Sequence, residues 1–311
     1  MPQSASDRAL EGASAAGHSL FVSAQDGLRL HVRAHGARTN RALPVVCLPG
    51  LARTTADFDT LAVALASDRE RPRRVLALDY RGRGKSDYDR KPANYNLQVE
   101  LADLLSVLTA LGIGRAAFVG TSRGGILTML LAVARPTAIA GCVLNDIGPV
   151  IDLEGLMRIK GYVGKLPALA GFPAAAEALK RRFGGLFPKW SDDDWLAFAR
   201  ATFKEAGGQL VPDYDPKLAT ILEAIGPEQP LPPLWKEFDA LGRIPMMVIR
   251  GANSDILSAA TVEAMRKRRR ALEVLEVPEE GHAPRLAGAL TIERIAGFVA
   301  SCDAAGSGYR S

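Results

Sequence analysis

The chain has 311 residues, of which 48% are hydrophobic and 23% charged, a composition typical of a globular protein with one large domain. Its longest apolar stretch, residues 126–134, is shorter than the about 20 residues that a membrane-spanning helix needs. The net charge of +5 is mild. The dense basic run at 266–270 lacks the interleaved aromatic residues of a nucleic-acid reader, so we interpret it as a solvated helix face. Membrane and nucleic-acid partners are therefore not expected.

The chain ends and the cysteines bear on where the protein works. Residues 1–17 have no basic start followed by an apolar stretch, so they do not resemble a secretory signal. Their small and polar residues predict a poorly ordered tail, and 303–311 are predicted to be a flexible C-terminal tail. Cys47 and Cys142 lie in apolar runs that predict buried thiols. Because three cysteines cannot form a paired framework, we expect a reducing, cytoplasmic setting. The oligomeric state is left open.

In chain order, short apolar runs alternate with helical patterns, which is typical of an α/β fold with a mostly parallel sheet flanked by helices. Asp26–Gly27 predicts a tight turn that joins the first two strands into a hairpin. Amphipathic or apolar helical patterns occupy 97–111 and 124–134. Strands are predicted at residues 20–23, 28–34, 45–48, 75–78, 116–119, 139–144, 246–249 and 272–277.

The alternation fails between residues 148 and 235. That stretch has no strand-like run, and its helical pieces are broken by prolines. Ser191, followed by three aspartates, predicts a well-capped helix start. We interpret 148–235 as a mostly helical insertion in one core domain, which is built from 18–147 and 236–302.

The sharpest motif is Gly120–Thr121–Ser122–Arg123–Gly124, a match to G-x-S-x-G. It directly follows the predicted strand 116–119 and precedes a helical pattern, which is the strand–turn–helix setting that this motif requires. In such a turn the serine projects its hydroxyl above the sheet edge, while glycines without a Cβ let strand and helix approach closely. Ser122 is thus predicted to be a nucleophile. The alternative is a glycine-rich turn with an incidental serine.

The base is predicted by elimination. A serine hydroxyl is a weak nucleophile until a base takes its proton, and with this elbow the partners follow in the order serine, acid, histidine. His18, His31 and His35 all precede Ser122. Only His282 follows it, in the loop after the predicted strand 272–277. We therefore predict His282 as the base.

The acid should lie in a loop at the carboxyl end of an earlier strand. Asp255 follows the predicted strand 246–249, and the interval from Asp255 to His282 fits one helix and one strand. Asp146, which follows the predicted strand 139–144, is the alternative. We predict that Asp255 orients His282.

Acyl transfer also needs donors aimed at the oxyanion. One should be the backbone N–H of Arg123, immediately after the nucleophile. The second is expected from the loop after strand 45–48, as the N–H of Leu51, because Gly50 lets that backbone come close to the serine. The side chain of Arg123 is expected to form a structural ion pair rather than to bind a substrate carboxylate.

These motifs resemble the α/β-hydrolase superfamily, in particular its serine branch with a helical cap, over nearly the whole chain after the N-terminal tail. The stretch Asp79–Asp87 resembles the family's Asp-x-Arg-Gly-x-Gly-x-Ser turn, whose glycines are mainly structural. Where many members have His-Gly in the oxyanion loop, this chain has Pro49–Gly50. A serine nucleophile argues against the members that open epoxides or cleave carbon–halogen bonds.

The resemblance implies hydrolysis without cofactor or metal. Ser122 would attack a carbonyl, His282 would take its proton, and the N–H groups of Leu51 and Arg123 would hold the oxyanion. The expected substrate is a small or medium apolar carboxylic ester. Carbon–carbon hydrolysis of meta-cleavage products, lactone hydrolysis, acyl transfer to another alcohol and a ligand receptor built on a retired hydrolase remain alternatives.

Overall fold

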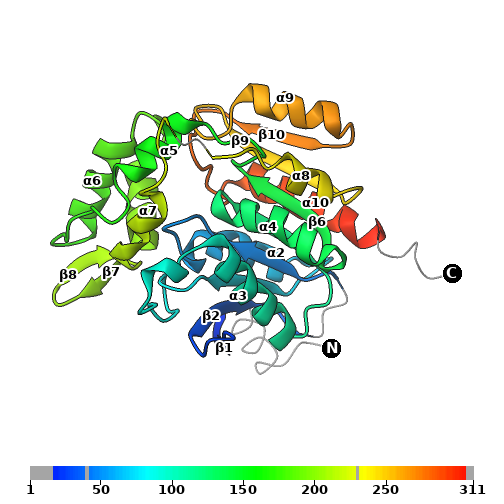
Figure 1. Ribbon diagram of the computed structural model, residues 1–311, viewed down its shortest axis with the longest axis horizontal. Coiled ribbons are helices and arrows are strands. Elements are labelled where there is room, and N and C mark those ends of the chain that lie inside the picture. The colour runs from blue at the N-terminus through cyan, green and yellow to red at the C-terminus, as the bar shows by residue number, and fades with distance from the viewer. Residues whose placement is uncertain (1–16, 39–41, 229–230, 306–311) are drawn as a thin grey trace, which may run out of the picture.

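The computed structural model describes residues 17–38, 42–228 and 231–305, and within these its strands form an eight-stranded sheet and a separate two-stranded hairpin. The sheet order is β1-β2-β4-β3-β5-β6-β9-β10 (Figure 1). Its strands are β1 (His18–Ser23), β2 (Arg29–His35), β3 (Val45–Leu48), β4 (Val75–Asp79), β5 (Ala116–Thr121), β6 (Ile139–Asn145), β9 (Met246–Gly251) and β10 (Glu273–Val277). Each predicted strand is therefore confirmed, with ends that differ by at most two residues.

The pairing direction places the functional loops together. β1 pairs antiparallel with β2, and β2 with β4, whereas the pairings from β4 through β10 are parallel. Because parallel strands end at the same edge, the loops after β3, β5, β6, β9 and β10 meet there.

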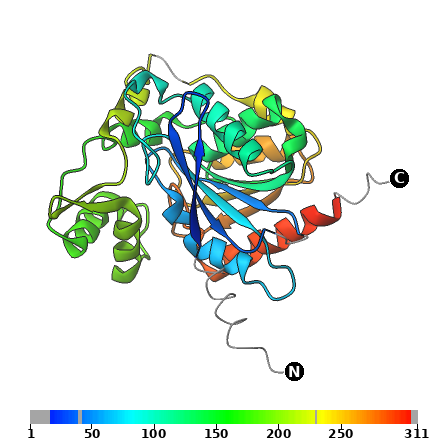
Figure 2. The ribbon, with the colours of Figure 1, turned by 90° about the horizontal axis from the view of Figure 1, so that it is seen from below.

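Helices cover both faces of the sheet (Figures 1 and 2). In β3, Val46 and Leu48 belong to one apolar cluster, and Val45 and Cys47 to the other. Burial on both faces explains why the central strands read as continuous apolar runs. The first cluster includes residues of α3 (Leu97–Ala110), α4 (Arg123–Ala134), α8 (Trp235–Ala240) and α9 (Ala259–Arg268), and the second includes residues of η1 (Thr55–Phe58), α2 (Asp59–Ala66) and α10 (Ala289–Ala305). The short helices η2 (Pro92–Asn94) and η3 (Pro136–Ala138) lie in connections.

The chain between β6 and α8 forms the insertion, most of which lies to one side of the sheet (Figures 1 and 2). A capping box at Ser191 starts α7, as predicted. The insertion also has an apolar cluster of its own, which includes the buried Trp195. Its elements are α5 (Leu153–Lys160), α6 (Phe172–Phe183), α7 (Asp192–Thr202), β7 (Phe203–Ala206), β8 (Gln209–Pro212) and η4 (Pro216–Leu222).

The expectation that the insertion has no strand was wrong. β7 and β8 pair antiparallel, joined by Gly207 and Gly208, whose φ angles are 59° and 76°. A two-residue turn with positive φ at both positions is the tight hairpin connection that glycine pairs favour. Whether residues 148–235 act as one unit stays a prediction.

The predicted C-terminal tail was wrong in its first residues. Helix α10 continues through Ala305, and Asp303 in it accepts hydrogen bonds from the backbone N–H of Leu43 and from the guanidinium of Arg73. Arg73 is only 2% exposed, so this ion pair ties the end of α10 to the core. The remaining predicted tail residues, 1–16 and 306–311, lie outside the described part of the chain.

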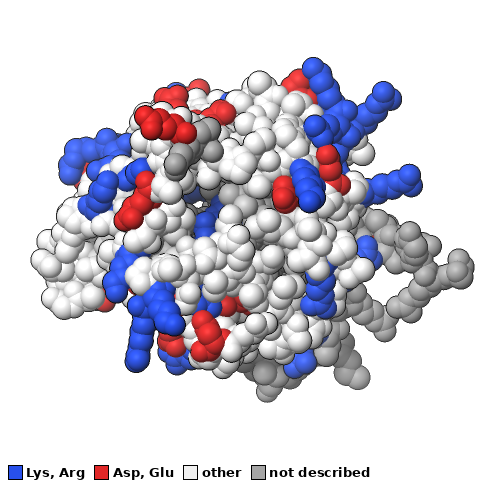
Figure 3. Space-filling view, viewed as in Figure 1, with Lys and Arg blue, Asp and Glu red and all other residues white. Residues whose placement is uncertain are grey.

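The remaining surface and core predictions can be placed as well. Cys47, Cys142 and Cys302 are buried free thiols. Residues 266–268 are exposed in the last turn of α9, where Figure 3 shows a cluster of basic side chains, which confirms the solvated face there. No helix in the described ranges is long and apolar enough to cross a membrane.

Candidate active site

Ser122 lies at a sharp bend between β5 and α4. Its φ and ψ are 51° and −114°, a conformation that a non-glycine residue seldom adopts. The backbone N–H of Ser122 donates to the carbonyl of Asn145 on β6, and its own carbonyl accepts from Gly125 N–H. The bend is therefore held from both sides, and the predicted strand–turn–helix setting is confirmed.

Two glycines of the motif are required by close approach. A Cβ on Gly124 would lie 2.0 Å from the carbonyl oxygen of Leu48, at the end of β3. A Cβ on Gly120 would lie 2.5 Å from the carbonyl carbon of Gly124. Both contacts involve backbone atoms that have no room to move. The spacing of the motif is thus a packing requirement of the elbow.

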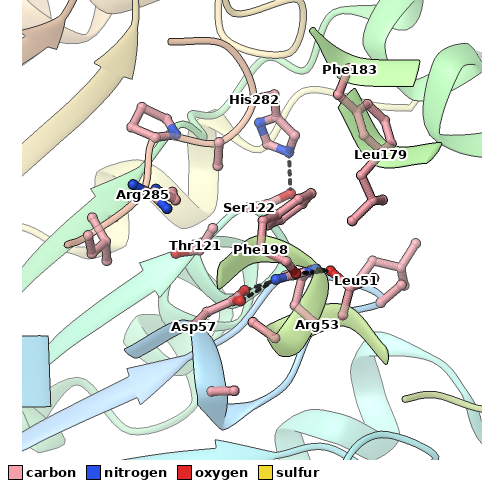
Figure 4. A pocket seen from close by; sticks show the side chains of 18 of the residues that line it. Leu51, Arg53, Asp57, Thr121, Ser122, Leu179, Phe183, Phe198, His282 and Arg285 are labelled. Carbon is pink, nitrogen blue, oxygen red and sulfur yellow. Dashed lines mark hydrogen bonds and ion pairs between the residues drawn. The ribbon is translucent and has the colours of Figure 1, made fainter. Parts of the chain in front are cut away.

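The side chains of Ser122, His282 and Asp146 form a hydrogen-bonded relay. His282 Nε2 lies 2.9 Å from Ser122 Oγ (Figure 4), and its Nδ1 lies 2.8 Å from Asp146 Oδ2. The side chain of His282 is 8% exposed and that of Asp146 is fully buried. This geometry lets an imidazole accept the serine proton while a carboxylate fixes its tautomer.

Asp146 is held by a dense set of donors. Its φ of 53° turns the chain sharply after β6, and its backbone N–H donates to Ile249 on β9 at 2.7 Å. Its Oδ1 accepts from the N–H of Gly251 at 2.8 Å, and its Oδ2 accepts from the hydroxyl of Ser254 at 2.5 Å. These donors fix the orientation of the buried carboxylate.

The prediction that Asp255 reaches His282 was wrong. The carboxylate of Asp255 instead forms a bidentate ion pair with the guanidinium of Arg158 on α5 of the insertion, in which its Oδ1 lies 2.8 Å from Nη2. Asp255 and Asp146 follow neighbouring strands, β9 and β6, so both are close to the site. The loop after β9 contributes the hydroxyl of Ser254 to the relay, one residue before the predicted acid.

Asn145 is a site residue that sequence reasoning missed. Its side-chain amide donates to Thr121 Oγ1 at 3.1 Å and to the carbonyl of Pro284 at 3.0 Å. It therefore joins the elbow to the loop that carries His282. The available signal was its position, at the end of a predicted strand and next to the alternative acid.

The predicted oxyanion donors border the same space. Gly50 and Leu51 line the pocket together with Ser122, and a Cβ on Gly50 would lie 3.9 Å from Ser122 Cβ. Arg123 opens α4, where its N–H has no intrahelical acceptor. Among the described residues, neither the N–H of Leu51 nor that of Arg123 donates to a protein group. Their role as oxyanion donors stays a proposal.

A cavity of about 210 Å³ opens above Ser122 and His282, between the core and the insertion. Figure 3 shows the surface hollowed in this region, and Figure 4 shows Leu179, Phe183 and Phe198 facing the serine. Most of the wall from the insertion is apolar or aromatic, supplied by Ile159, Tyr162, Val163, Leu166, Leu179, Phe183, Phe187, Trp190, Phe198 and Tyr214.

Charges at the pocket wall are matched. Arg53 forms a bidentate pair with Asp57, donates to Thr202 on α7, and stacks 4.4 Å from the centre of the Phe198 ring. Although burial disfavours its charged form, Asp57 raises the pKa of Arg53 above its ordinary value. In the described residues, no group of three or more His, Cys, Asp or Glu side chains is arranged to hold a metal ion.

The comparison with protein families decides the family. The model of the alpha/beta hydrolase family matches residues 45–294, which contain the elbow, both candidate acids and His282. The chain belongs to the α/β-hydrolase family. It is therefore a hydrolase, and the mostly parallel sheet flanked by helices is the fold of that family.

Relatives of known structure or name agree with this assignment. The hydrolase is 32% identical to the 3-hydroxybutyrate-oligomer hydrolase of Cupriavidus necator, over 85% of this chain and 91% of that protein. It is 27% identical to the 2-(acetamidomethylene)succinate hydrolase of Mesorhizobium japonicum, over 80% and 85%. A crystal structure of an α/β hydrolase from Novosphingobium aromaticivorans superposes with a TM-score of 0.85 at 41% identity, covering 92% of this chain and 98% of that one.

Proposed function

We propose that this hydrolase cleaves carboxylic esters of small or medium apolar substrates through an acyl-enzyme. The observation that carries the proposal is the Ser122–His282–Asp146 relay at the floor of an apolar pocket. A cavity of about 210 Å³ is smaller than the roughly 300–1,000 Å³ of drug-sized ligand sites, which favours a small acyl group.

The mechanism follows from the hydrogen bonds of the relay. Ser122 Oγ attacks the ester carbonyl carbon while its proton passes to His282 Nε2, and Asp146 stabilises the imidazolium through Nδ1. The N–H groups of Leu51 and Arg123 hold the oxyanion. His282 then protonates the departing alcohol. A water molecule, deprotonated by His282, attacks the acyl-enzyme, releases the acid and restores Ser122.

The name of one relative supports an ester substrate. The Cupriavidus necator relative is named for oligomers of 3-hydroxybutyrate, and the units of a hydroxy-acid oligomer are joined by ester bonds. Short 3-hydroxybutyrate oligomers therefore belong in the first substrate panel. The cytoplasmic setting remains part of the proposal, supported by three free thiols.

The test is hydrolysis of nitrophenyl esters of graded acyl length and of 3-hydroxybutyrate oligomers, with Ser122→Ala as the control. Loss of the nucleophile in such a relay costs on the order of 10⁶-fold in turnover, so the variant should be inactive. Full activity of Ser122→Ala would reject Ser122 as nucleophile. Wild-type protein that ignores esters and cleaves a meta-cleavage diketone or a lactone would reject the ester proposal in favour of those alternatives.

A further inference from the structure

A buried ionic cluster lies behind the two predicted oxyanion donors. Glu100, on α3, contacts Arg83 with its Oε1, 2.8 Å from Nη1, and Arg123 with its Oε2, 2.6 Å from Nε. The side chains of Arg83 and Glu100 are fully buried and that of Arg123 is 9% exposed. Two guanidinium groups and one carboxylate leave the cluster with a net positive charge.

The cluster stays charged despite its burial. Burial alone favours the neutral acid, but the guanidinium groups of Arg123 and Arg83 outweigh it and hold the pKa of Glu100 below its usual range. Nη2 of each arginine is buried and has no hydrogen-bond partner. Buried charges are costly unless paired, so the excess positive charge is a feature that needs an explanation.

One end of the cluster holds the oxyanion loop. Arg83 Nε–H donates to the carbonyl of Leu51 at 2.9 Å, and the hydroxyl of Tyr80 donates to the carbonyl of Pro49 at 3.2 Å. The peptide that carries the Leu51 N–H lies between these two anchored carbonyls. This peptide unit joins Gly50 to Leu51, and glycine restricts the backbone less than any other residue. The side chains of Tyr80 and Arg83 therefore supply the rigidity that the glycine does not.

The other end holds the start of α4. Arg123 carries the second predicted N–H donor on its own backbone, and its side chain is fixed by Glu100. A single carboxylate thus links the turn that anchors Leu51 to the residue that follows the nucleophile. The two donors come from loops after β3 and β5, which no backbone hydrogen bond joins at this point in the described chain.

We propose that Arg83 and Glu100 are positioning residues for the oxyanion hole, which fix the N–H groups of Leu51 and Arg123 relative to each other and place a net positive charge behind the oxyanion. The inference rests on the proposed function, because it assumes that Ser122 attacks a carbonyl or similar centre. Oxyanion donors act through preorganised geometry, so their alignment affects the transition state more than substrate binding.

The test compares two arginines of one turn, Arg83→Lys and Arg81→Lys. Arg81 is 1% exposed, and its side chain pairs with Asp103 at 2.7 Å and with Asp89 and Asp26. None of these partners lies on the oxyanion loop. A lysine at 83 lacks the rigid planar fork by which Arg83 bonds the Leu51 carbonyl through Nε and Glu100 through Nη1. We expect Arg83→Lys to lower kcat by about 10–100-fold with KM within about threefold, since a misplacement near 1 Å costs up to about 10²-fold. Arg81→Lys should lose stability but keep kcat per folded molecule.

A second readout does not depend on the substrate. When a fluorophosphonate phosphonylates an activated serine, the serine oxygen bonds to phosphorus, the serine proton passes to the base and fluoride leaves. Negative charge develops on the phosphoryl oxygen during this step, so the labelling rate at Ser122 should fall in Arg83→Lys by the same factor as kcat. The acid limb of the pH profile should not move, because His282 and Asp146 are untouched. Tyr80→Phe removes only the hydrogen bond to the Pro49 carbonyl, and it replaces Arg83→Lys in the test if Arg83→Lys does not fold. Labelling of Ser122 in Tyr80→Phe should be about 3–10-fold slower than in the wild type, which is the effect expected for the loss of one neutral hydrogen bond.

The outcomes separate this inference from the proposed function. The inference would be overturned if folded Arg83→Lys or Tyr80→Phe were labelled and turned over substrate at the wild-type rate. It would also be overturned if Arg81→Lys lost as much kcat per folded molecule as Arg83→Lys. If the wild-type protein is labelled at Ser122 but cleaves no ester, the proposed substrate class is rejected. The inference is then still decided by comparing the labelling rates of the variants and the wild type. A wild-type Ser122 that is not labelled at all rejects both.

Discussion

A comparison of Asp146, which contacts His282, with Asp255, which was predicted to do so, gives the sharpest test of the relay. In Asp146→Asn, the remaining side-chain oxygen still accepts from Gly251 N–H, so the turn after β6 is kept. The amide nitrogen then takes the position of Oδ2, opposite His282 Nδ1, where it donates instead of accepting. The ring is driven to the tautomer with its proton on Nε2, which cannot accept the proton of Ser122.

The expected loss in kcat for Asp146→Asn is about 10⁴-fold, the size found where this substitution leaves a serine relay in the wrong tautomer. This loss corresponds to about 5 kcal/mol in the activation free energy. Asp255→Asn is the matched control, since it removes only the charge of a pair with Arg158. It should lower the free energy of unfolding by about 1–3 kcal/mol and leave kcat within about threefold.

The assay is nitrophenyl ester hydrolysis, with circular dichroism and thermal unfolding to show that each variant is folded. Fluorophosphonate labelling of Ser122 gives a second measure of nucleophile activation. Folded Asp255→Asn that loses activity by orders of magnitude, while Asp146→Asn remains active, would refute the geometric argument and restore the prediction made from the sequence.

The elbow glycine, the C-terminal ion pair and the thiols give three further predictions. Gly124→Ala places a methyl group against the Leu48 carbonyl; we expect a loss of about 1–3 kcal/mol in unfolding free energy and strongly reduced labelling of the nucleophile, measured together. Although burial opposes it, Arg73 holds the pKa of Asp303 below its usual range. The pair therefore stabilises the fold above pH about 4, and the difference in unfolding free energy between wild type and Asp303→Asn should shrink as the pH falls through the folded-state value. A thiol reagent at pH 8 should react only after unfolding, because burial raises the pKa of Cys142 to about 12 and that of Cys302 to about 11, and also raises that of Cys47.

The sequence was sufficient for the elbow and the histidine. Ser122 is specified by local packing, since the glycines on either side leave one arrangement of strand and helix. His282 followed from elimination among four histidines. The first inference depends on a local motif and the second on order along the chain, and the sequence preserves both. The apolar runs of the central strands were equally readable, because strands buried on both faces need such runs.

The acid could not be chosen in the same way. Asp146 and Asp255 follow adjacent parallel strands, so chain order and strand position fit either one. What separates them is the direction of each side chain. Asp146 turns toward His282 through a positive φ, and Asp255 turns away because Arg158 lies opposite it. Arg158 belongs to the insertion, whose placement over the core is a tertiary contact that no local pattern encodes.

The rejected aspartate still bears on the relay, through its neighbour. Ser254, whose hydroxyl donates to Asp146, precedes Asp255, and the ion pair with Arg158 holds that loop against the insertion. On the other side of the site, Arg285, three residues after His282, pairs with Asp194 at the start of α7. The insertion is therefore bonded to the two loops that support the acid and the base. Because packed, bonded elements transmit strain, we expect loss of the Arg285–Asp194 pair to alter turnover as well as substrate binding. Asp255→Asn should change turnover little, because the Ser254 hydroxyl still donates to Asp146.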